Sequence, residues 1–557
     1  MPKRAEMWER LSSQVDLLVI GGGITGTGVA RDGARRGLRV ALVEQDDLAS
    51  GTSSRSSKLV HGGLRYLEHY EFSLVFEAVS ERRILMDIAP HLVNPLAFLF
   101  PVYKDSRRNL WFIKTGMWIY EGLSLFRSPK LHENLSPAEL REREPGLRQR
   151  ELTGAPLYYD CATDDARLTL ETAMDATRAG AVVVTRARVT SLLRDEGGRV
   201  CGAVVEDTLS GERKEVRAHV VINATGPWTD GVRAMGAQAA PAPLLRPTKG
   251  VHIVVDAGRL PLQHAVVCFH PDDGRALFAI PWGDRSYVGT TDTDYDGPLD
   301  DLAATGEDVD YLLRAMGSYF PDAALQRADV ISTWAGLRPL IAPPSGDAAD
   351  ESAVSREHHI EVGRDGLISI AGGKLTTYRR MSGEVVDTAV KLLRLSSGLP
   401  AKLLAPETDT EPLPGAVGWP SDDDAERVAR RILDVGTPHI AQDTALWLAN
   451  TYGTRGVELA RWVRRDPSLA ARLVEGRPEI LAAVDWAVEE ECATRLEDVM
   501  LRRTQLYYRD LDQGLGALDA VSERMAALLG WDAARRAEEV AIYRAEVTRS
   551  RRWKQRP

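Results

Sequence analysis

Cysteine is scarce in this sequence of 557 residues. The four cysteines lie far apart, at Cys161, Cys201, Cys268 and Cys492, and no Cys-x-x-Cys pair occurs. Neither a zinc site nor a disulfide framework is therefore indicated, and no metal site is expected. A reducing, cytoplasmic setting fits this cysteine usage best.

Long apolar runs and a basic excess are also missing. No run of 18 or more uninterrupted apolar residues occurs, and the N-terminal MPKRAEMWERLSSQ lacks the apolar core of a signal peptide, so neither a spanning helix nor secretion is expected. The net charge of −10 argues against general nucleic-acid binding. No Walker A loop, HExxH motif or Ser-His-Asp arrangement supports a kinase or a hydrolase.

The best-organised stretch is VDLLVIGGGITGTGVARDGARRGLRVALVE, residues 15–44. Its pattern predicts a buried strand over 15–20, a helix over about 24–36, and a second strand that ends at Glu44. Gly21, Gly23 and Gly26 have the GxGxxG spacing that brings a pyrophosphate against the start of a helix. Glu44 is placed to accept hydrogen bonds from a ribose 2′-hydroxyl, which disfavours NADP and leaves NAD or FAD.

Two later segments favour FAD. Residues 218–230 (AHVVINATGPWTD) and 366–387 (GLISIAGGKLTTYRRMSGEVVD) each predict a short strand that runs into glycines, as if the chain returned twice to the same sheet. A nucleotide domain that is interrupted and completed late in the chain is typical of large flavoproteins.

The rest of the chain changes character twice. Residues 244–340 contain short β-branched or aromatic strands between Gly, Asp and Pro turns, which predict an antiparallel sheet that roofs the cofactor. From about residue 410 the pattern is helical, after a Pro- and acid-rich segment that we interpret as a linker. The predicted fold is α/β plus α: a two-domain FAD-binding flavoprotein, with a Rossmann-like FAD domain and an antiparallel-sheet substrate domain, followed by a C-terminal helical domain. The predicted boundaries are 1–75, 150–240 and 345–400 for the FAD domain, 76–149 and 241–344 for the substrate or cap domain, and 401–557 for the helical domain.

Cationic residues occur on segments that this framework should bring together. Arg65, Arg338, Arg356 and Lys374 would form a site for a strongly anionic ligand. The alternative for each is an ion pair on a solvated face. His61 and His270 are the candidate bases for removing a hydroxyl proton, and the alternative for both is a structural, hydrogen-bonded imidazole.

Two other segments have open interpretations. Residues 109–126 (NLWFIKTGMWIYEGLSLF) predict either a core helix or a helix in a membrane interface, with Trp111, Trp118 and Tyr120 at headgroup depth. The basic tail RSRRWKQRP is either solvated or touches anionic lipid.

Several motifs in order closely resemble the FAD-dependent, aerobic-type glycerol-3-phosphate dehydrogenase family. They are IGGGITGTGVARD, GTSSRSSKLVHGGLRYLEHYEFSLV, DDARLTLETA, VINATGPW, IPWGDRSYVGTTDTDY, AGLRPL and GGKLTTYR, and the resemblance covers residues 15–400, with a helical domain beyond. It implies oxidation of sn-glycerol 3-phosphate to dihydroxyacetone phosphate by hydride transfer to FAD, with the electrons passed to a membrane quinone.

The resemblance also implies roles for single residues. Arg65, Tyr66, Arg338, Arg356 and Lys374 would surround the substrate and its phosphate, and His61 would lie beside the flavin; Lys374 or a water held by Arg338 are alternatives to His61 as the proton acceptor. The FAD lining would comprise Gly21, Gly23, Ile24, Thr25, Gly26, Glu44, Thr52, Ser53, Ser57, Leu59, Val189, Gly226, Trp228, Gly373, Lys374, Leu375 and Thr376.

Two rival functions stay open. A related oxidase would pass electrons to O2 and make H2O2, although no low-complexity insertion of the kind such oxidases carry is present. A catalytically silent FAD-binding module would have no need for Arg65, Arg338, Arg356 and Lys374 together. We expect a homodimer by default, located in the cytoplasm and bound peripherally to the inner face of the cell membrane.

Overall fold

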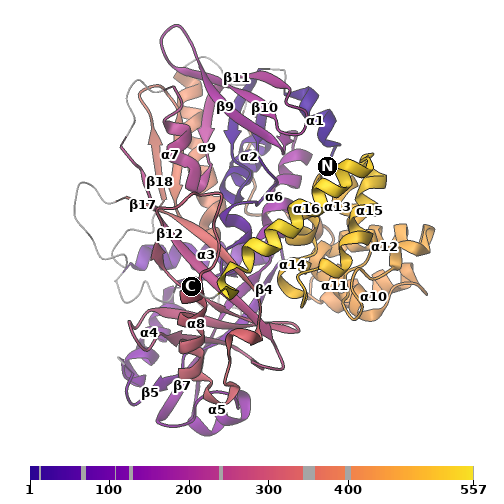
Figure 1. The fold of residues 1–557 in the computed structure, drawn as a ribbon. Coiled ribbons are helices and arrows are strands. Elements are labelled where there is room, and N and C mark those ends of the chain that lie inside the picture. The colour runs from indigo at the N-terminus through magenta and orange to yellow at the C-terminus, as the bar shows by residue number, and fades with distance from the viewer. Residues whose placement is uncertain are drawn as a thin grey trace.

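The structure is a computed structural model that describes residues 1–11, 14–63, 71–106, 108–123, 130–236, 242–342, 358–395 and 403–555. Two β-sheets form the body of the molecule, and a group of C-terminal helices lies against one side of both (Figure 1). The predicted fold class is confirmed.

The first sheet has the Rossmann-like arrangement. Its main strands, in spatial order, are β18 (His358–Val362), β19 (Ile368–Gly372), β11 (Arg213–Asn223), β1 (Val15–Ile20), β2 (Val40–Val43) and β8 (Val182–Val184). All neighbours pair in parallel except β18 and β19. β9 (Ala187–Arg194) and β10 (Val200–Asp207) add an antiparallel extension to the first half of β11. The strands predicted to return to this sheet, at 218–230 and 366–387, therefore lie on the same side of β1.

The apolar run of β1 is buried on both faces because successive side chains alternate. Leu17 and Val19 belong to the core beneath the helices, whereas Leu18 and Ile20 belong to the core on the opposite face. The helices that cover the sheet are α2 (Ile24–Arg35), α6 (Asp165–Arg178) and α9 (Tyr378–Leu395), with α1 (Arg4–Arg10) on the other side.

The second sheet is mainly antiparallel. Two of its three longest strands, β12 (Leu245–Asp256) and β17 (Val330–Ile341), pair along nearly their whole length. The remaining members are β3 (Leu59–Val60), β4 (Val93–Leu99), β5 (Val102–Tyr103), β6 (Glu133–Leu135), β7 (Leu152–Thr163), β13 (Ala265–Phe269), β14 (Ala276–Trp282), β15 (Arg285–Gly289) and β16 (Thr293–Asp294). β3 and β7 pair here although their residues fall in ranges assigned to the FAD domain; the division into domains stays a prediction.

Helices complete the part of the molecule around the second sheet. They are α3 (Phe72–Ile88), α4 (Leu110–Leu123), α5 (Pro137–Arg143) and α8 (Gly306–Tyr319), and the short α7 (Thr229–Arg233) follows β11. α3 packs on α4, and α4 on β7.

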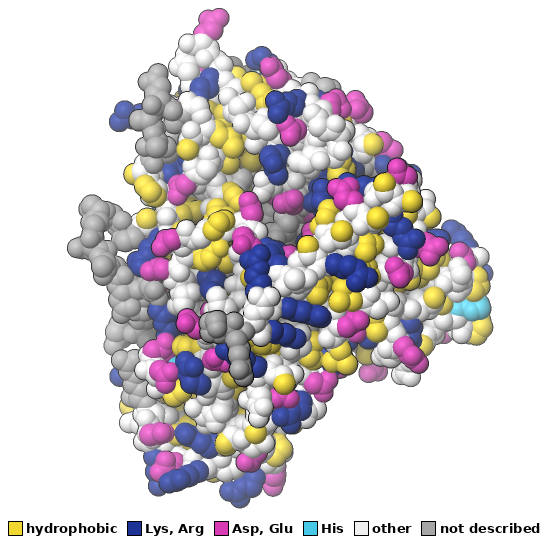
Figure 2. Space-filling view, viewed as in Figure 1, with side chains coloured by type: hydrophobic (Ala, Val, Ile, Leu, Met, Phe, Trp, Pro, Cys, Tyr) yellow, Lys and Arg dark blue, Asp and Glu magenta, His cyan; other side chains and the backbone are white. Residues whose placement is uncertain are grey.

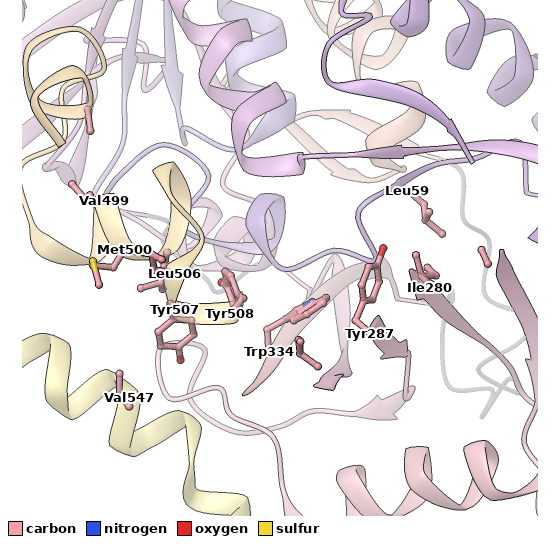
Figure 3. Close-up of a cluster of buried hydrophobic side chains, with 14 of the residues drawn as sticks. Leu59, Ile280, Tyr287, Trp334, Val499, Met500, Leu506, Tyr507, Tyr508 and Val547 are labelled. Carbon is pink, nitrogen blue, oxygen red and sulfur yellow. The ribbon is translucent and has the colours of Figure 1, made fainter. Parts of the chain in front are cut away.

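The C-terminal domain is helical, as predicted. Its elements are α10 (Ala425–Gly436), α11 (Gln442–Tyr452), α12 (Gly456–Arg465), α13 (Ala482–Glu489), a π-helix at Asp498–Arg503, α14 (Leu506–Arg509), α15 (Leu518–Leu529) and α16 (Ala533–Ser550). One hydrophobic cluster runs from this domain into the second sheet: Val499, Met500, Leu506, Tyr507 and Tyr508 continue into Trp334, Tyr287, Ile280 and Leu59 (Figure 3).

The segment interpreted as a linker is packed onto the body. The buried guanidinium of Arg31 donates to the carbonyls of Thr408 and Glu411 at 2.9 and 2.7 Å, and Leu413 is fully buried. The basic tail is anchored to the body, because Trp553 is buried in the core between α8 and the second sheet. Arg552 and Lys554 beside it are exposed, and contact of these cations with anionic lipid stays a prediction.

Candidate functional site

A cavity of about 370 Å³ opens at the carboxyl ends of the parallel strands of the first sheet. Ligands of such sheets bind there, because the connections diverge at that edge. Its wall comes from Ile20, Gly21, Gly23, Ile24, Thr25, Val43, Glu44, Gln45, Ser50, Gly51, Thr52, Ser53, Ser56, Ala187, Val189, Ala224, Thr225, Gly226, Pro227, Trp228, Gly231, Val232, Met235, Pro339, Ile370, Ala371, Gly372, Gly373, Lys374 and Leu375.

The glycine turn between β1 and α2 is set by close main-chain packing. Gly21 has φ +110°, and a Cβ there would lie 2.6 Å from the carbonyl oxygen of Ala224. A Cβ on Gly26 would lie 2.0 Å from the carbonyl oxygen of Gly21, so this residue lets α2 pack on the turn. Gly26 therefore supports the wall from behind and does not line the cavity.

The first turn of α2 faces the cavity. The N-cap residue is Gly23, which has no side chain to cap the helix. The Ile24 amide donates to Ser53 Oγ at 2.9 Å. A helix N-terminus with main-chain amides and a partial positive charge is suited to phosphate groups.

Glu44 closes the cavity at the end of β2. Its two carboxylate oxygens accept from the amides of Gly22 (2.6 Å) and Asp46 (2.8 Å). Burial raises the pKa of Glu44 to about 7, although these two hydrogen bonds lower it in part. A buried acid at this position, a glycine floor and a helix N-terminus together fit the ribose and pyrophosphate of a dinucleotide.

Most residues predicted to line the cofactor do line this cavity. They are Gly21, Gly23, Ile24, Thr25, Glu44, Thr52, Ser53, Val189, Gly226, Trp228, Gly373, Lys374 and Leu375. Besides Gly26, three predicted residues are absent from the wall: Ser57, Leu59 and Thr376. The lining residues that were not predicted as cofactor contacts include Gln45, Ser50, Gly51, Ser56, Ala187, Met235, Pro339, Ile370 and Ala371. Gly51 and Ser56 lie within the motif GTSSRSSKLVHGGLRYLEHYEFSLV and Ser50 directly precedes it, which was the available signal.

Three of the predicted catalytic residues, Lys374, Arg338 and His61, lie on the cavity wall or on segments next to it. Lys374 lines the wall, and Arg338 directly precedes the lining residue Pro339. The Arg338 guanidinium is held by Asp292 Oδ1 at 2.8 Å and by Thr290 Oγ1 at 3.0 Å. The half-buried His61 is tied to the same region, since its amide donates to Thr376 Oγ1 at 3.2 Å.

His270 is not brought to the cavity wall. It is buried in the second sheet and stacks on the Tyr311 ring with centroids 3.6 Å apart. Its Nδ1 accepts from the Asp272 amide at 3.1 Å, and Nε2 donates to the Tyr311 carbonyl at 3.0 Å. Both ring nitrogens of His270 thus form hydrogen bonds within the protein, so His270 is a structural imidazole and not a base at this site. Arg65, Tyr66 and Arg356 lie outside the described residues.

The loop between the cofactor wall and β3 is braced from behind. The buried Lys58 ammonium pairs with Asp165 at 2.6 Å. Trp334 Nε1 donates to the Ser56 carbonyl at 3.1 Å, and the Tyr287 hydroxyl donates to the Ser57 carbonyl at 2.9 Å. This bracing fixes residues 56–58 where the chain leaves the cavity.

His252 is a residue that sequence reasoning passed over. Its Nε2 lies 2.9 Å from Ser57 Oγ, and its ring stacks on Trp334 with centroids 4.7 Å apart. Burial, and then the charges of Arg338 and Lys58, hold the pKa of His252 well below its usual range, so the imidazole is neutral. It sits in an ordinary apolar strand, GVHIVVD, which gives no signal of this contact.

An exposed apolar face lies on α3 and α4. Trp111 is 75% exposed and Trp118 60%, and the face continues through Phe72, Phe76, Phe112 and Ile119. Tyr120 is not part of it: this residue is buried, and its hydroxyl donates to Asp160 Oδ1 at 2.8 Å. The prediction of Tyr120 at headgroup depth is therefore wrong.

In the described ranges, no helix has the length and apolarity needed to cross a bilayer, and no group of three or more metal-ligating side chains is found. On the face seen in Figure 2, Lys and Arg side chains are interspersed with Asp and Glu, so that face has no extended field of one sign.

Comparison with known proteins agrees with this geometry. Residues 16–379 match the family model described as FAD dependent oxidoreductase, and residues 406–536 match the C-terminal domain of alpha-glycerophosphate oxidase. The protein is a FAD-dependent oxidoreductase, and the cavity, which we name the FAD cavity, is the candidate site for this cofactor.

Relatives that match nearly the whole chain identify its family among the FAD-dependent oxidoreductases. The chain is 40% identical over 551 residues to glycerol-3-phosphate dehydrogenase 2 of Mycobacterium tuberculosis (strain ATCC 25618 / H37Rv), which covers 98% of this chain and 90% of that protein. It is 38% identical over 531 residues to the aerobic glycerol-3-phosphate dehydrogenase of Staphylococcus saprophyticus, with 95% and 94% covered. The crystal structure of the glycerol-3-phosphate dehydrogenase from Bacillus halodurans complexed with FAD superposes with a TM-score of 0.81 at 32% identity, covering 100% of this chain and 99% of that one. The chain belongs to the FAD-dependent glycerol-3-phosphate dehydrogenase family.

Proposed function

We propose that the protein oxidises sn-glycerol 3-phosphate to dihydroxyacetone phosphate and passes the electrons to a membrane quinone. The observation that carries the proposal is that Lys374 lines the FAD cavity, while Arg338 and His61 lie on segments beside its wall. Bound FAD supplies the hydride acceptor for the substrate's C2 hydrogen. The named activity of the relatives supports the same reaction.

The substrate phosphate is a dianion that needs fixed positive charge. Arg338 is suited to this task because Asp292 and Thr290 hold its guanidinium in place before the substrate arrives. Lys374, after the positive-φ Gly373, adds a second cation on the cavity wall. Arg65, Tyr66 and Arg356 are proposed as further substrate contacts from the sequence.

The C2 hydroxyl proton needs an acceptor beside the cavity. His61 is our proposal, because Thr376 binds both its amide and its carbonyl and so fixes the position of its backbone. We expect His61→Gln to slow anaerobic bleaching of the flavin by glycerol 3-phosphate about 100-fold or more. Stopped-flow absorbance measures this rate, and an equal rate at every pH would assign the proton to Lys374 or to water.

The quinone proposal rests on the position of the exposed apolar face. The buried side of α4 packs against the loop after β3: a Cβ on Gly62 would lie 2.1 Å from the Tyr120 hydroxyl. The opposite side of α4 carries Trp111 and Trp118, so the face and His61 are separated by about one helix diameter, ~10 Å. A bilayer quinone would therefore have a short route to the flavin.

Oxygen as the acceptor is the second candidate, because the C-terminal domain matches a model named for an oxidase. The deciding experiment reduces the purified yellow protein anaerobically with glycerol 3-phosphate and then reoxidises it separately with a quinone analogue and with air. Quinone reoxidation much faster than air reoxidation supports the proposal. Fast air reoxidation with stoichiometric H2O2 would replace it with the oxidase, and no bleaching would leave a silent FAD-binding module.

Membrane contact, at the inner face of the cell membrane, is proposed on the same apolar face. We expect the double variant Trp111→Ser/Trp118→Ser to lose most binding to anionic vesicles, since burying each indole contributes about 1.5–3 kcal/mol. Vesicle co-sedimentation measures the binding. The control is Leu511→Ser, which removes a 67% exposed side chain from the C-terminal domain. Equal loss in both proteins would contradict this membrane face.

A homodimer stays a prediction, which analytical ultracentrifugation can test.

A further inference from the structure

Residues 498–509, which we name the docking segment, are one of several parts of the C-terminal domain that contact the body of the protein. The docking segment contains the π-helix Asp498–Arg503 and α14, joined through Gln505 in the left-handed conformation (φ 60°). π-helices are rare and are frequently found at functional sites. None of the residues in this segment, all of which are described, lines the FAD cavity.

The docking segment forms buried ion pairs with the loop that follows Glu44. The Arg502 Nε donates to Asp47 Oδ2 at 2.6 Å, and Arg503 Nη2 donates to Asp47 Oδ1 at 2.9 Å. The Asp47 and Arg503 side chains are 1% exposed and that of Arg502 is 6% exposed, so these are buried ion pairs. Asp47 belongs to the same loop as the cavity residues Glu44, Gln45, Ser50 and Gly51.

The segment also holds a second loop of the cavity wall. Asp498 accepts from Arg186 Nη2 at 2.5 Å and from Arg502 Nη2 at 2.6 Å. Burial opposes ionisation of Asp498, but the three guanidinium groups around it lower its pKa below the ordinary value. Arg186 has φ +54° and directly precedes the lining residues Ala187 and Val189, and its amide donates to the Asp46 carbonyl at 2.8 Å.

The other end of the docking segment reaches the braced loop at 56–58. Tyr508 packs on Trp334, and its ring lies 5.6 Å from the Lys58 ammonium (Figure 3). Gln505 Nε2 donates to Asp164 Oδ2 at 2.7 Å, beside the Asp165 that pairs with Lys58. One segment of the C-terminal domain therefore touches the supports of three loops around the cofactor.

We infer that the docking segment is a positioning element of the FAD site: Arg502, Arg503 and Asp498 hold the loops at 44–51 and 185–189 in the shape that binds FAD. A buried ion-pair network is a weak source of stability but fixes one arrangement of its partners, and breaking one partner leaves an uncompensated charge. FAD binding and docking of the C-terminal domain are then coupled, and the coupling is reciprocal. The free energy by which bound FAD stabilises the docked C-terminal domain equals the free energy by which docking stabilises bound FAD.

The first test measures FAD affinity of the full-length apoprotein by flavin fluorescence. Asp47→Asn and Arg503→Gln are expected to raise the Kd roughly tenfold, within the about 5–150-fold range of ordinary coupling. Arg503→Lys should recover part of this loss, because an ammonium reaches one carboxylate oxygen. The matched control is Arg524→Gln, which removes a two-bond ion pair with Asp485 inside the C-terminal domain and leaves the Kd unchanged.

The second test needs no variant and covers the case in which a variant does not fold. In the wild-type chain, FAD should slow amide hydrogen exchange in residues 498–509, although these residues do not line the cavity. Unchanged exchange there would overturn the inference. A fall in melting temperature for Asp47→Asn with an unchanged Kd would also overturn it, since the network would then be structural only.

Discussion

The two ends of the FAD cavity are built by different means. At the nucleotide end the wall is main chain, with Gly21 and Gly26 allowing backbone to approach backbone and the first turn of α2 offering amides. At the other end Lys374 lines the wall, and Arg338, which directly precedes the lining residue Pro339, is held in place by another charged residue, Asp292. The first end is therefore sensitive to any added atom, whereas the second is sensitive to the loss of a charge.

The largest effect is expected from Gly26→Ala. The new Cβ would lie 2.0 Å from the Gly21 carbonyl oxygen, so the turn must move away from its FAD-binding shape. We expect purification without FAD and a loss of about 1–3 kcal/mol in the free energy of unfolding, as for other overpacked sites. Absorbance at the flavin band and denaturant unfolding measure the two effects.

The matched control for this variant is Gly317→Ala in α8, where an added Cβ meets nothing within 4 Å. FAD content should stay at the wild-type level, and the stability should be equal or slightly higher. If Gly26→Ala kept its FAD as well, close main-chain packing would not explain the nucleotide end.

The same contrast explains what could be predicted from the sequence. The strand at 15–20, the helix after it and Glu44 follow from one local stretch, because turn geometry and apolar periodicity are local properties. The roles of His252 and the docking segment depend on contacts between residues far apart in the sequence: Ser57 and His252 are 195 positions apart, and Asp47 and Arg502 are 455. Nothing in the neighbouring sequence signals such partners.

For a related reason, the sequence of an amphipathic segment did not predict which of its aromatic side chains are buried and which are exposed. The aromatic residues of 109–126 predicted either a core helix or a membrane-interface helix, and α4 has both faces: Tyr120 is buried whereas Trp111 and Trp118 are exposed. In the same way, Trp553 within the basic tail is buried in the core between α8 and the second sheet. Composition gives the amount of apolar surface, but the tertiary fold decides which part of it is covered.

At the charged end, Arg338→Ala should raise the KM for glycerol 3-phosphate about 10–150-fold while FAD stays bound, because a charge-assisted contact contributes about 1.5–3 kcal/mol. Steady-state kinetics measure the change, and Arg338→Lys should restore part of it. Arg259→Ala, which breaks an exposed pair with Asp329 in the same domain, is the control. Unchanged KM and kcat in Arg338→Ala would remove Arg338 from the phosphate site.

The smallest effect concerns Glu44, an ionisable group at the nucleotide end of the cavity. Its pKa of about 7 in the unliganded protein means that it is protonated below that pH and ionised above it. Ribose hydroxyls that donate to the carboxylate stabilise the ionised form, so the protein with Glu44 protonated should bind FAD more weakly. A decrease of about one pKa unit on binding would make FAD affinity about tenfold higher at pH 8 than at pH 5. Isothermal titration at both pH values measures the ratio, and Glu44→Gln should abolish its pH dependence. A ratio that persists in the Gln variant would mean that another group titrates, and that the nucleotide end is less purely a main-chain site than its geometry indicates.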